Sequence, residues 1–268
     1  MKIEYIIGIL IIWGLISCSD RDENQEPTYG KVNVALSVTL PEPENVHSLA
    51  RSYTDSEIKN VDVLVFDEDG KFMERVKVDG GELTPSGTEI SFSIRLDATS
   101  KRRVIHLVTN GRSPDGVTDR LNFNDITSGM LESAAIPALG TTAMIFGSLE
   151  DQVMPLIMWG RVELPTGINI VTKADGVKLL RVAACVQVKK GVGDATNGLN
   201  DFIIQSVTVD KGFDRGYLTP ANYSTVVTPV TGRPLSGSTL NYANGWSDGE
   251  TPSLYIYERN CTVADYMG

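Results

Sequence analysis

The chain contains few of the residues on which enzymes most often rely for chemistry. Its 268 residues include only 3 cysteines and 2 histidines, and His47 and His106 stand far apart. It has no Gly-x-Ser-x-Gly elbow and no glycine-rich phosphate loop. Cys185 and Cys261 do not form a metal-spaced set with either histidine. We therefore predict no catalytic residue, no metal site and no cofactor, and we expect that the protein is not an enzyme.

An excess of positive charge is also absent. The formal net charge is −10 and the sequence pI is about 4.8. An acidic surface repels phosphate groups. We therefore expect no nucleic-acid partner.

The chain has no apolar run long enough to span a membrane as a helix, which takes about 20 residues. Its longest run, residues 6–16, follows one basic residue and has the length of the apolar region of a secretory signal. Residues 15–18, Leu-Ile-Ser-Cys, resemble a bacterial lipobox. That resemblance implies a signal peptide over 1–17, cleavage between Ser17 and Cys18, and a lipid on Cys18. An ordinary signal peptide with a chance cysteine is the alternative.

The segment that follows the lipobox, residues 18–29, is polar and rich in acidic residues. Such a composition buries too little apolar surface to fold, which predicts a flexible tether. It is also similar to the acidic stretch that marks surface export in Bacteroidetes lipoproteins, although a plain spacer fits equally well. We expect the protein at the cell outer membrane, on the cell surface.

Most of the remaining sequence has the two-residue period of β-strands. Strands are predicted at 31–40, 58–66, 72–78, 89–96, 103–110, 168–172, 177–189, 202–209 and 254–258, with turns at 67–70 and 173–176, short apolar stretches at 144–147 and 153–160, and helix-like residues at 126–135. Strands and helices do not alternate, so a parallel α/β sheet is not expected. We predict an all-β fold with two antiparallel β-sandwich domains, at 30–166 and 167–268.

Four local patterns have structural rather than functional interpretations that we favour. His106 lies inside an apolar strand and is predicted to be a packed core residue. The acidic turn at 67–70 lacks the later ligands of a calcium loop and is predicted to be a plain hairpin turn. The basic residues 101–103 are expected in a solvated turn, although they are also a second target for a protease. Cys185 is predicted to be a small buried side chain.

The order of several segments resembles the fimbrillins of Bacteroidales, the subunits of type V pili. The lipobox is followed by an arginine-containing loop and by strands that are similar to family segments. These segments are 48–52, 58–70, 180–188, where Cys185 replaces a frequent lysine, and 255–258. The resemblance implies two transthyretin-like β-sandwich domains and a fimbrial, adhesive function without catalysis. A monomeric, glycan-binding surface lipoprotein is the alternative.

The resemblance also implies assembly by strand exchange. In such pilins an Arg-specific maturation protease removes the N-terminal segment with its first strand, and a strand donated by another pilus subunit fills the groove. Here the removed strand would be 31–40 and the cleavage point Arg51-Ser52. Arg51 could equally be an ordinary loop residue, and anchor-type subunits of the family keep their N-terminus and lipid. The chain stops soon after 254–258, so we expect the second domain to be incomplete or to lack a donor strand.

Overall fold

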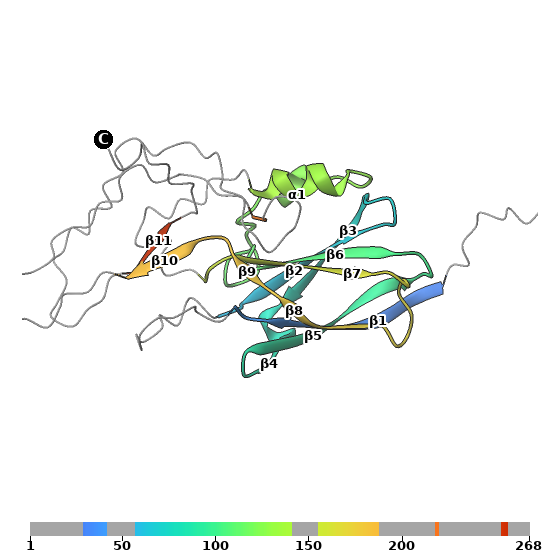
Figure 1. Cartoon of the computed structure of the whole chain (residues 1–268), viewed down its shortest axis with the longest axis horizontal. Helices are drawn as coiled ribbons and strands as arrows, with labels where there is room; N and C mark the ends of the chain where they lie inside the picture. Colours follow the sequence, from blue (N-terminus) through green and yellow to red (C-terminus); the bar gives the residue numbers. More distant parts are fainter. Residues whose placement is uncertain (1–28, 42–56, 141–154, 188–217, 220–252, 257–268) are drawn as a thin grey trace, which may run out of the picture.

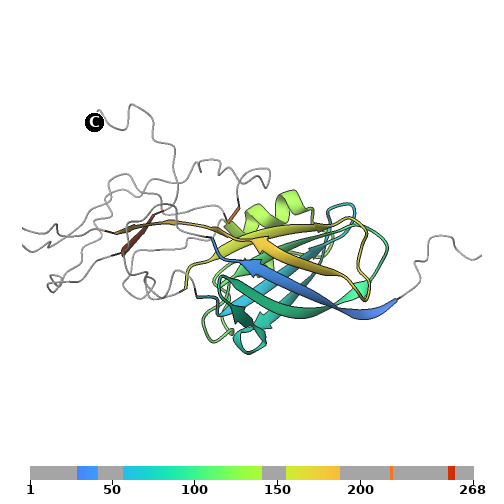
Figure 2. The ribbon, with the colours of Figure 1, turned by 60° about the horizontal axis from the view of Figure 1, so that its bottom comes forward.

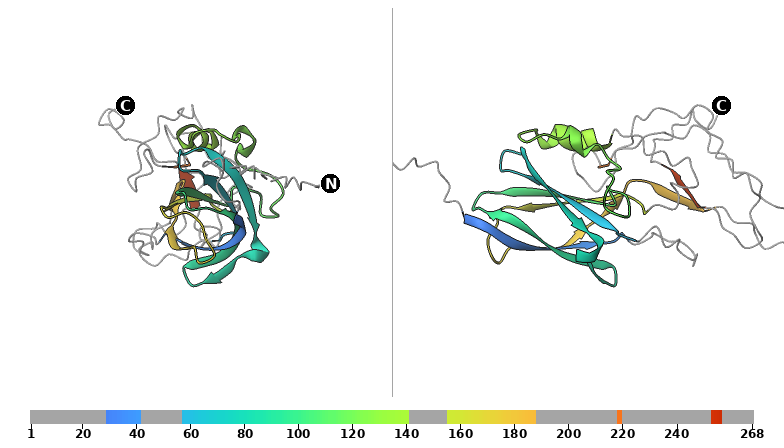
Figure 3. Two further views of the ribbon diagram at one scale, coloured as in Figure 1. Left: turned by 90° about the vertical axis from the view of Figure 1, so that its right-hand side faces the viewer. Right: turned by 180° about the vertical axis from the view of Figure 1, so that it is seen from behind.

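Two β-sheets packed face to face make up most of the structure. The computed structural model describes residues 29–41, 57–140, 155–187, 218–219 and 253–256. In Figure 1 the two sheets lie one above the other, with the helix α1 outside the upper sheet. The end view in Figure 3 shows the same layers. The prediction of an all-β fold is confirmed.

The lower sheet in Figure 1 has four strands in the order β4-β5-β1-β8. They are β1 (Tyr29–Thr39), β4 (Thr84–Ser86), β5 (Glu89–Ala98) and β8 (Lys173–Lys178). Exposed and buried residues alternate along β5, as expected for a strand with one face on a core and the other in water. The strands predicted at 31–40 and 89–96 are confirmed.

The upper sheet has five strands in the order β3-β2-β6-β7-β9. They are β2 (Asn60–Phe66), β3 (Phe72–Asp79), β6 (Arg103–Thr109), β7 (Met158–Leu164) and β9 (Leu180–Arg181). Every residue of β2 and of β6 is buried, because both faces of this sheet are covered. The hairpin predicted at 58–78 and the central strand predicted at 103–110 are confirmed.

The main core lies between the two sheets. Alternate residues point into it from both sides, among them Val34, Leu36 and Val38 of β1 and Val61, Val63 and Val65 of β2. All six are at most 2% exposed. A core of this kind holds the two layers together through apolar burial.

A second apolar cluster lies on the outer face of the five-stranded sheet. Helix α1 (Glu132–Gly140) covers this face and contributes Ile136 and Leu139, with a short 3-10 turn (Phe123–Asp125) beside it. The helix expected at 126–135 is wrong in position. Met130 O accepts a hydrogen bond from Phe72 N, and Gly129 N donates to Phe72 O. These bonds to β3 keep the preceding residues out of the helix.

The strand assignments after residue 166 need correction. Residues 169–172 form a turn, whereas the predicted turn at 173–176 is the start of β8. The long strand predicted at 177–189 is instead divided among β8, β9 and β10 (Ala184–Gln187). The reason is that the chain passes at Leu179 from the four-stranded to the five-stranded sheet.

The sandwich therefore continues past residue 166 to β9. Strand β10 pairs antiparallel with β11 (Ser253–Ile256) in a separate two-stranded sheet, which bears out the strand predicted at 254–258. The strand predicted at 202–209 lies outside the described residues, as does most of 167–268. A second domain there stays a prediction. No helix in the described part of the chain is long and apolar enough to cross a membrane.

Candidate functional site

Strand β1, which contains the strand that the fimbrillin resemblance implies is exchanged, occupies the interior of the four-stranded sheet. It pairs antiparallel with β5 from Tyr29 opposite Ala98 to Thr39 opposite Glu89. Its other edge pairs parallel with β8. Figure 2 shows β1, in blue, between β5 and the gold β8. Both backbone edges of β1 are thus used by strands that come later in the chain.

One face of β1 fills a groove in the main core. Val34, Leu36 and Val38 are 0%, 1% and 0% exposed, and Val32 and Leu40 are partly buried against the same core. The opposite face is different, since Lys31, Asn33 and Ala35 are exposed. The groove therefore selects apolar side chains at every second residue.

The groove is costly to leave empty. Full burial of one aliphatic side chain contributes about 1.5 to 3 kcal/mol, so the three innermost residues of β1 together contribute roughly 5 to 9 kcal/mol. That is comparable with the whole free energy of unfolding of a typical domain. Loss of β1 without a replacement would therefore be expected to destabilise the sandwich strongly.

Strand β1 meets a bulge in β8. Leu36 pairs with Ala174 and Val38 pairs with Val177, so Ser37 lies opposite two residues. The second of them, Gly176, has a positive φ of 65°, which glycine adopts without strain. Its N–H donates a hydrogen bond to Ser37 Oγ at 2.7 Å.

The predicted processing residues lie outside the described residues. Arg51 and Ser52 fall within 42–56, between β1 and β2, and Ser17 and Cys18 fall before residue 29. Their roles in cleavage and lipidation therefore stay predictions. What the described residues do place is the strand that such a cleavage would detach.

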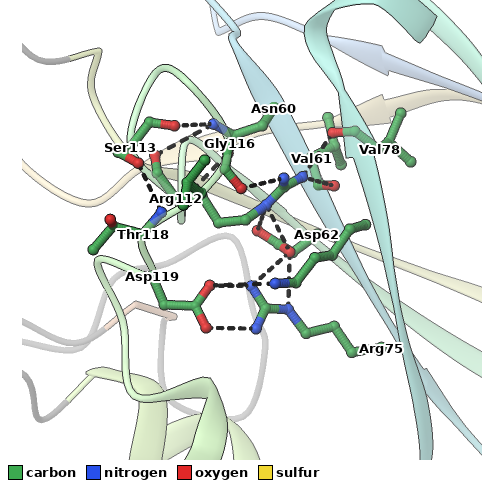
Figure 4. A network of polar contacts seen from close by, with 12 residues as sticks. Asn60, Val61, Asp62, Arg75, Val78, Arg112, Ser113, Gly116, Thr118 and Asp119 are labelled. Atoms are coloured by element: carbon green, nitrogen blue, oxygen red, sulfur yellow. Dashed lines mark hydrogen bonds and ion pairs between the residues drawn. The ribbon is translucent and has the colours of Figure 1, made fainter.

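An ionic network that includes Asp62, Arg75 and Arg112 lies at one end of the outer face of the five-stranded sheet (Figure 4). Arg112, whose side chain is 1% exposed, forms an ion pair with Asp62 at 3.2 Å and a second with Asp79. It also donates to the carbonyl oxygens of Val78 at 2.8 Å and of Gly116 at 3.0 Å. One side chain thereby connects β2, β3 and the loop after β6.

A second arginine completes this network. Arg75 Nε donates to Asp62 Oδ1 at 2.9 Å, and its two terminal nitrogens bind Asp119 at 2.9 and 2.6 Å. The guanidinium also lies 3.5 Å from the centroid of the Phe123 ring. Burial raises the pKa of Asp62, and the two arginines oppose that rise. The network fixes the 110–123 loop to the sheet.

His106 forms the centre of a second polar cluster, under helix α1. Its side chain is 0% exposed, so the prediction of a packed core histidine is confirmed. Trp159 Nε1 donates to His106 Nδ1 at 2.9 Å. Nδ1 is therefore an acceptor, and the proton lies on Nε2, which donates to Glu132 Oε1 at 2.7 Å. Arg161 Nε also donates to Glu132, at 2.8 Å.

The electrostatics of this cluster predict a loss of stability in acid. Burial opposes ionisation of Glu132, but hydrogen bonds from His106 and Arg161 lower its pKa from 4.5 to about 2. The pKa of Glu132 is lower in the folded state than in the unfolded state. Ionised Glu132 therefore stabilises the fold fully at a pH above its unfolded-state pKa, and this stabilisation is lost as the pH falls toward 2. Burial also lowers the pKa of His106 below 6.5, so protonation of the ring opposes folding below that pH.

We expect the free energy of unfolding to fall by about 3 kcal/mol more in the wild type than in Glu132→Gln between about pH 6 and pH 2. Urea unfolding at a series of pH values measures this difference. Glu89→Gln is the control, since that carboxylate is exposed on β5 in the other sheet, away from His106 and Arg161. Parallel pH curves for the wild type and Glu132→Gln would contradict the assignment.

Two further structural interpretations, those of the turns at 67–70 and 101–103, are tested by the geometry. The 67–70 turn is a plain hairpin turn, in which Asp67 Oδ1 accepts from the backbone N–H groups of Asp69 and Lys71. The solvated turn expected at 101–103 is partly wrong. Arg103 is 7% exposed and pairs with Glu68 at 2.9 Å, because it is already the first residue of β6.

Sequence reasoning missed both polar clusters. The position of Asp62 could have indicated a buried ion pair, because a carboxylate inside an apolar strand needs a buried partner. Its partner Arg112 lies fifty positions away, and no sequence period indicates that pairing. Within the described residues, no group of three or more His, Cys, Asp or Glu side chains could hold a metal ion.

Comparisons with known proteins found similar solved structures and a matching family model. Crystal structures of similar proteins include a fimbrial assembly protein from Parabacteroides distasonis, with 16% identity, a TM-score of 0.49 and coverage of 87% of this chain and 78% of that chain. They also include the tip fimbrial protein Mfa3 from Porphyromonas gingivalis with a C-terminal truncation, with 12% identity, a TM-score of 0.48 and coverage of 87% and 71%. No curated protein matches the chain.

A family model also matches the chain. The model of the fimbrillin-A associated anchor proteins Mfa1 and Mfa2 matches residues 23–182. That segment is more than half of the chain and ends just after β9, with which the sandwich ends. The chain therefore belongs to the fimbrillin-A associated anchor protein family, a structural family of cell-surface fimbriae.

Proposed function

We propose that the protein is a fimbrial subunit that reaches the surface of the outer membrane as a lipoprotein and joins its neighbours by strand exchange. In this proposal cleavage after Arg51 releases β1, and a strand from another subunit enters the groove. The observation that carries the proposal is the position of β1. It is the first strand of the sandwich, it fills the core, and its link to β2 runs through Arg51.

Cleavage at Arg51 would change what holds β1 in place. Before the cut, β1 is held by covalent connection as well as by its contacts. Afterwards it is a separate peptide that is bound without a covalent link to β2, by backbone hydrogen bonds to β5 and β8 and by its side-chain contacts, chiefly those of its three innermost residues. A donated strand can offer the same backbone groups and a similar apolar face. Exchange then replaces one set of contacts by an equivalent set.

Two versions of the proposal differ in the fate of the lipid. If Arg51 is cleaved, the lipid on Cys18 leaves with the N-terminal segment and serves only for delivery. If Arg51 stays intact, the lipid remains a permanent anchor and β1 keeps its groove. The description of the matching family as anchor proteins fits the second version, in which β1 is not exchanged and which is the alternative to the exchange proposed here.

Treatment of the full-length, surface-exposed precursor with an Arg-specific protease tests the proposal. We expect a discrete product that begins at Ser52 by N-terminal sequencing and that enters detergent-resistant oligomers when the other pilus subunits are present. Arg51→Ala should block both, whereas Arg102→Ala, at a surface arginine of the folded domain, should block neither. A precursor that gives no such product and no oligomer contradicts the exchange version.

The lipid has its own test. Metabolic labelling with a fatty acid should mark the wild type, and Cys18→Ala should abolish the label. Labelling that survives Cys18→Ala contradicts the proposed lipid site.

A further inference from the structure

We propose that any strand that occupies the position of β1 in the sheet must carry a small hydrogen-bond acceptor beside Gly176. In β1 this acceptor is the hydroxyl of Ser37. This inference rests on the proposed strand exchange and specifies the partner. The partner is an extended segment with apolar residues at the positions of Val34, Leu36 and Val38. It also has serine or threonine at the position of Ser37.

The requirement comes from the bulge in β8. One residue of β1 faces Asp175 and Gly176, and an extra residue of this kind interrupts the regular ladder of backbone hydrogen bonds. The Gly176 N–H instead donates to Ser37 Oγ at 2.7 Å. Ser37 is 5% exposed and Gly176 is partly exposed, so a strand without this hydroxyl leaves the amide with only partial access to water. An amide left unsatisfied in this way carries a free-energy cost.

The contact also restricts the register of the incoming strand. Alternating apolar residues alone allow a strand to slip by two positions, since such a slip keeps the same face toward the core. A slip that brings Ala35 beside Gly176 would preserve the apolar contacts but would remove the acceptor. The hydroxyl therefore disfavours a slip in this direction, whereas the opposite slip would bring the hydroxyl of Thr39 beside Gly176.

The first measurement uses the intact full-length chain. Hydrogen–deuterium exchange at the Gly176 amide should become about tenfold faster in Ser37→Ala and should be nearly unchanged in Ser37→Thr. Ala35→Ser is the matched control, because it adds a hydroxyl at the exposed neighbouring position. Equal exchange rates in Ser37→Ala and the wild type would show that the contact does not form, and would overturn the inference.

The second measurement uses the full-length chain opened between β1 and β2, at Arg51 or at a protease site inserted within 42–56. Labelled synthetic peptides of residues 29–41 are allowed to compete for the groove. We expect the wild-type, Ser37→Thr and Ala35→Ser peptides to bind within about twofold of one another. The Ser37→Ala peptide should bind about fivefold to tenfold more weakly.

The outcomes separate the two proposals. If the wild-type peptide enters and the Ser37→Ala peptide binds equally well, strand exchange stands and the selective role of Ser37 is overturned. If the wild-type peptide does not enter the opened protein, the proposed exchange is itself overturned, together with the selectivity that rests on it. The Gly176 amide would then report only a structural contact.

Discussion

Replacement of Arg112 by alanine is expected to lower the free energy of unfolding by about 3 to 5 kcal/mol. The side chain is almost fully buried and pairs with Asp62, whose own side chain is 0% exposed. Its loss leaves the carbonyl oxygens of Val78 and Gly116 without this donor, and it removes one of the two positive charges that balance Asp62. Urea unfolding at neutral pH measures the change.

Arg102→Ala is the matched control for this prediction. Arg102 is also an arginine paired with a carboxylate, at 3.0 Å from Glu163, but its side chain is 37% exposed. Exposed ion pairs contribute at most about 1 kcal/mol, so the control should stay close to the wild type. If the two substitutions cost the same, the buried network does not hold the 110–123 loop to the sheet.

Substitution of Leu36 by aspartate should remove the folded sandwich altogether. An unpaired carboxylate at a position that is 1% exposed, combined with the loss of a buried leucine, costs about 4 kcal/mol or more. That is a large part of the stability of an ordinary domain. We expect loss of the cooperative thermal transition, measured by circular dichroism, and a low yield of soluble protein.

The neighbouring residue supplies the control. Ala35→Asp introduces the same charge one position away on the exposed face of β1, so its thermal transition should remain within a few degrees of the wild type. Full stability of Leu36→Asp would mean that β1 is not packed in the groove. It would also remove the physical basis of strand exchange.

The hairpin of β2 and β3 could be predicted because its information is local. The turn at 67–70 contains the residues that a tight turn requires, and Asp67 caps it through its side chain. Strand β5 could be predicted equally well, since its alternation of polar and apolar residues is typical of a sheet with one solvent-exposed face. In both cases neighbouring residues determine the structure, and a sequence pattern detects them.

Strand β8 could not be predicted in this way. Residues 173–176, Lys-Ala-Asp-Gly, have the composition of a turn, yet they form a strand because β1 pairs with them from far away in the sequence. The glycine that suggested a turn is instead the residue that adopts the positive φ of the bulge. Pairing with a strand that is distant in sequence decided the conformation here, rather than local composition. Such pairing is a common reason why a strand is mistaken for a turn.

The candidate site was predicted in outline but not in detail. The apolar alternation of 31–40 identified the strand and the face that it buries. The acceptor role of Ser37 was not predictable, because it depends on the bulge in β8. The pairing of Asp62 with Arg112 depends likewise on the path of a loop, which residue spacing does not record.

The topology of β1 has a consequence for the order of folding. The strand comes first in the chain, but its partners begin only at Glu89 and at Lys173. Contacts between residues so distant in sequence form slowly, because the intervening chain must first be ordered. We therefore expect β1 to stay without its first partner until Ala98 has been synthesised and without its second until Lys178 has been synthesised. Pairing of β1 with β8 is then a late event of folding, and it closes the same groove that a neighbouring subunit would enter in the proposed exchange.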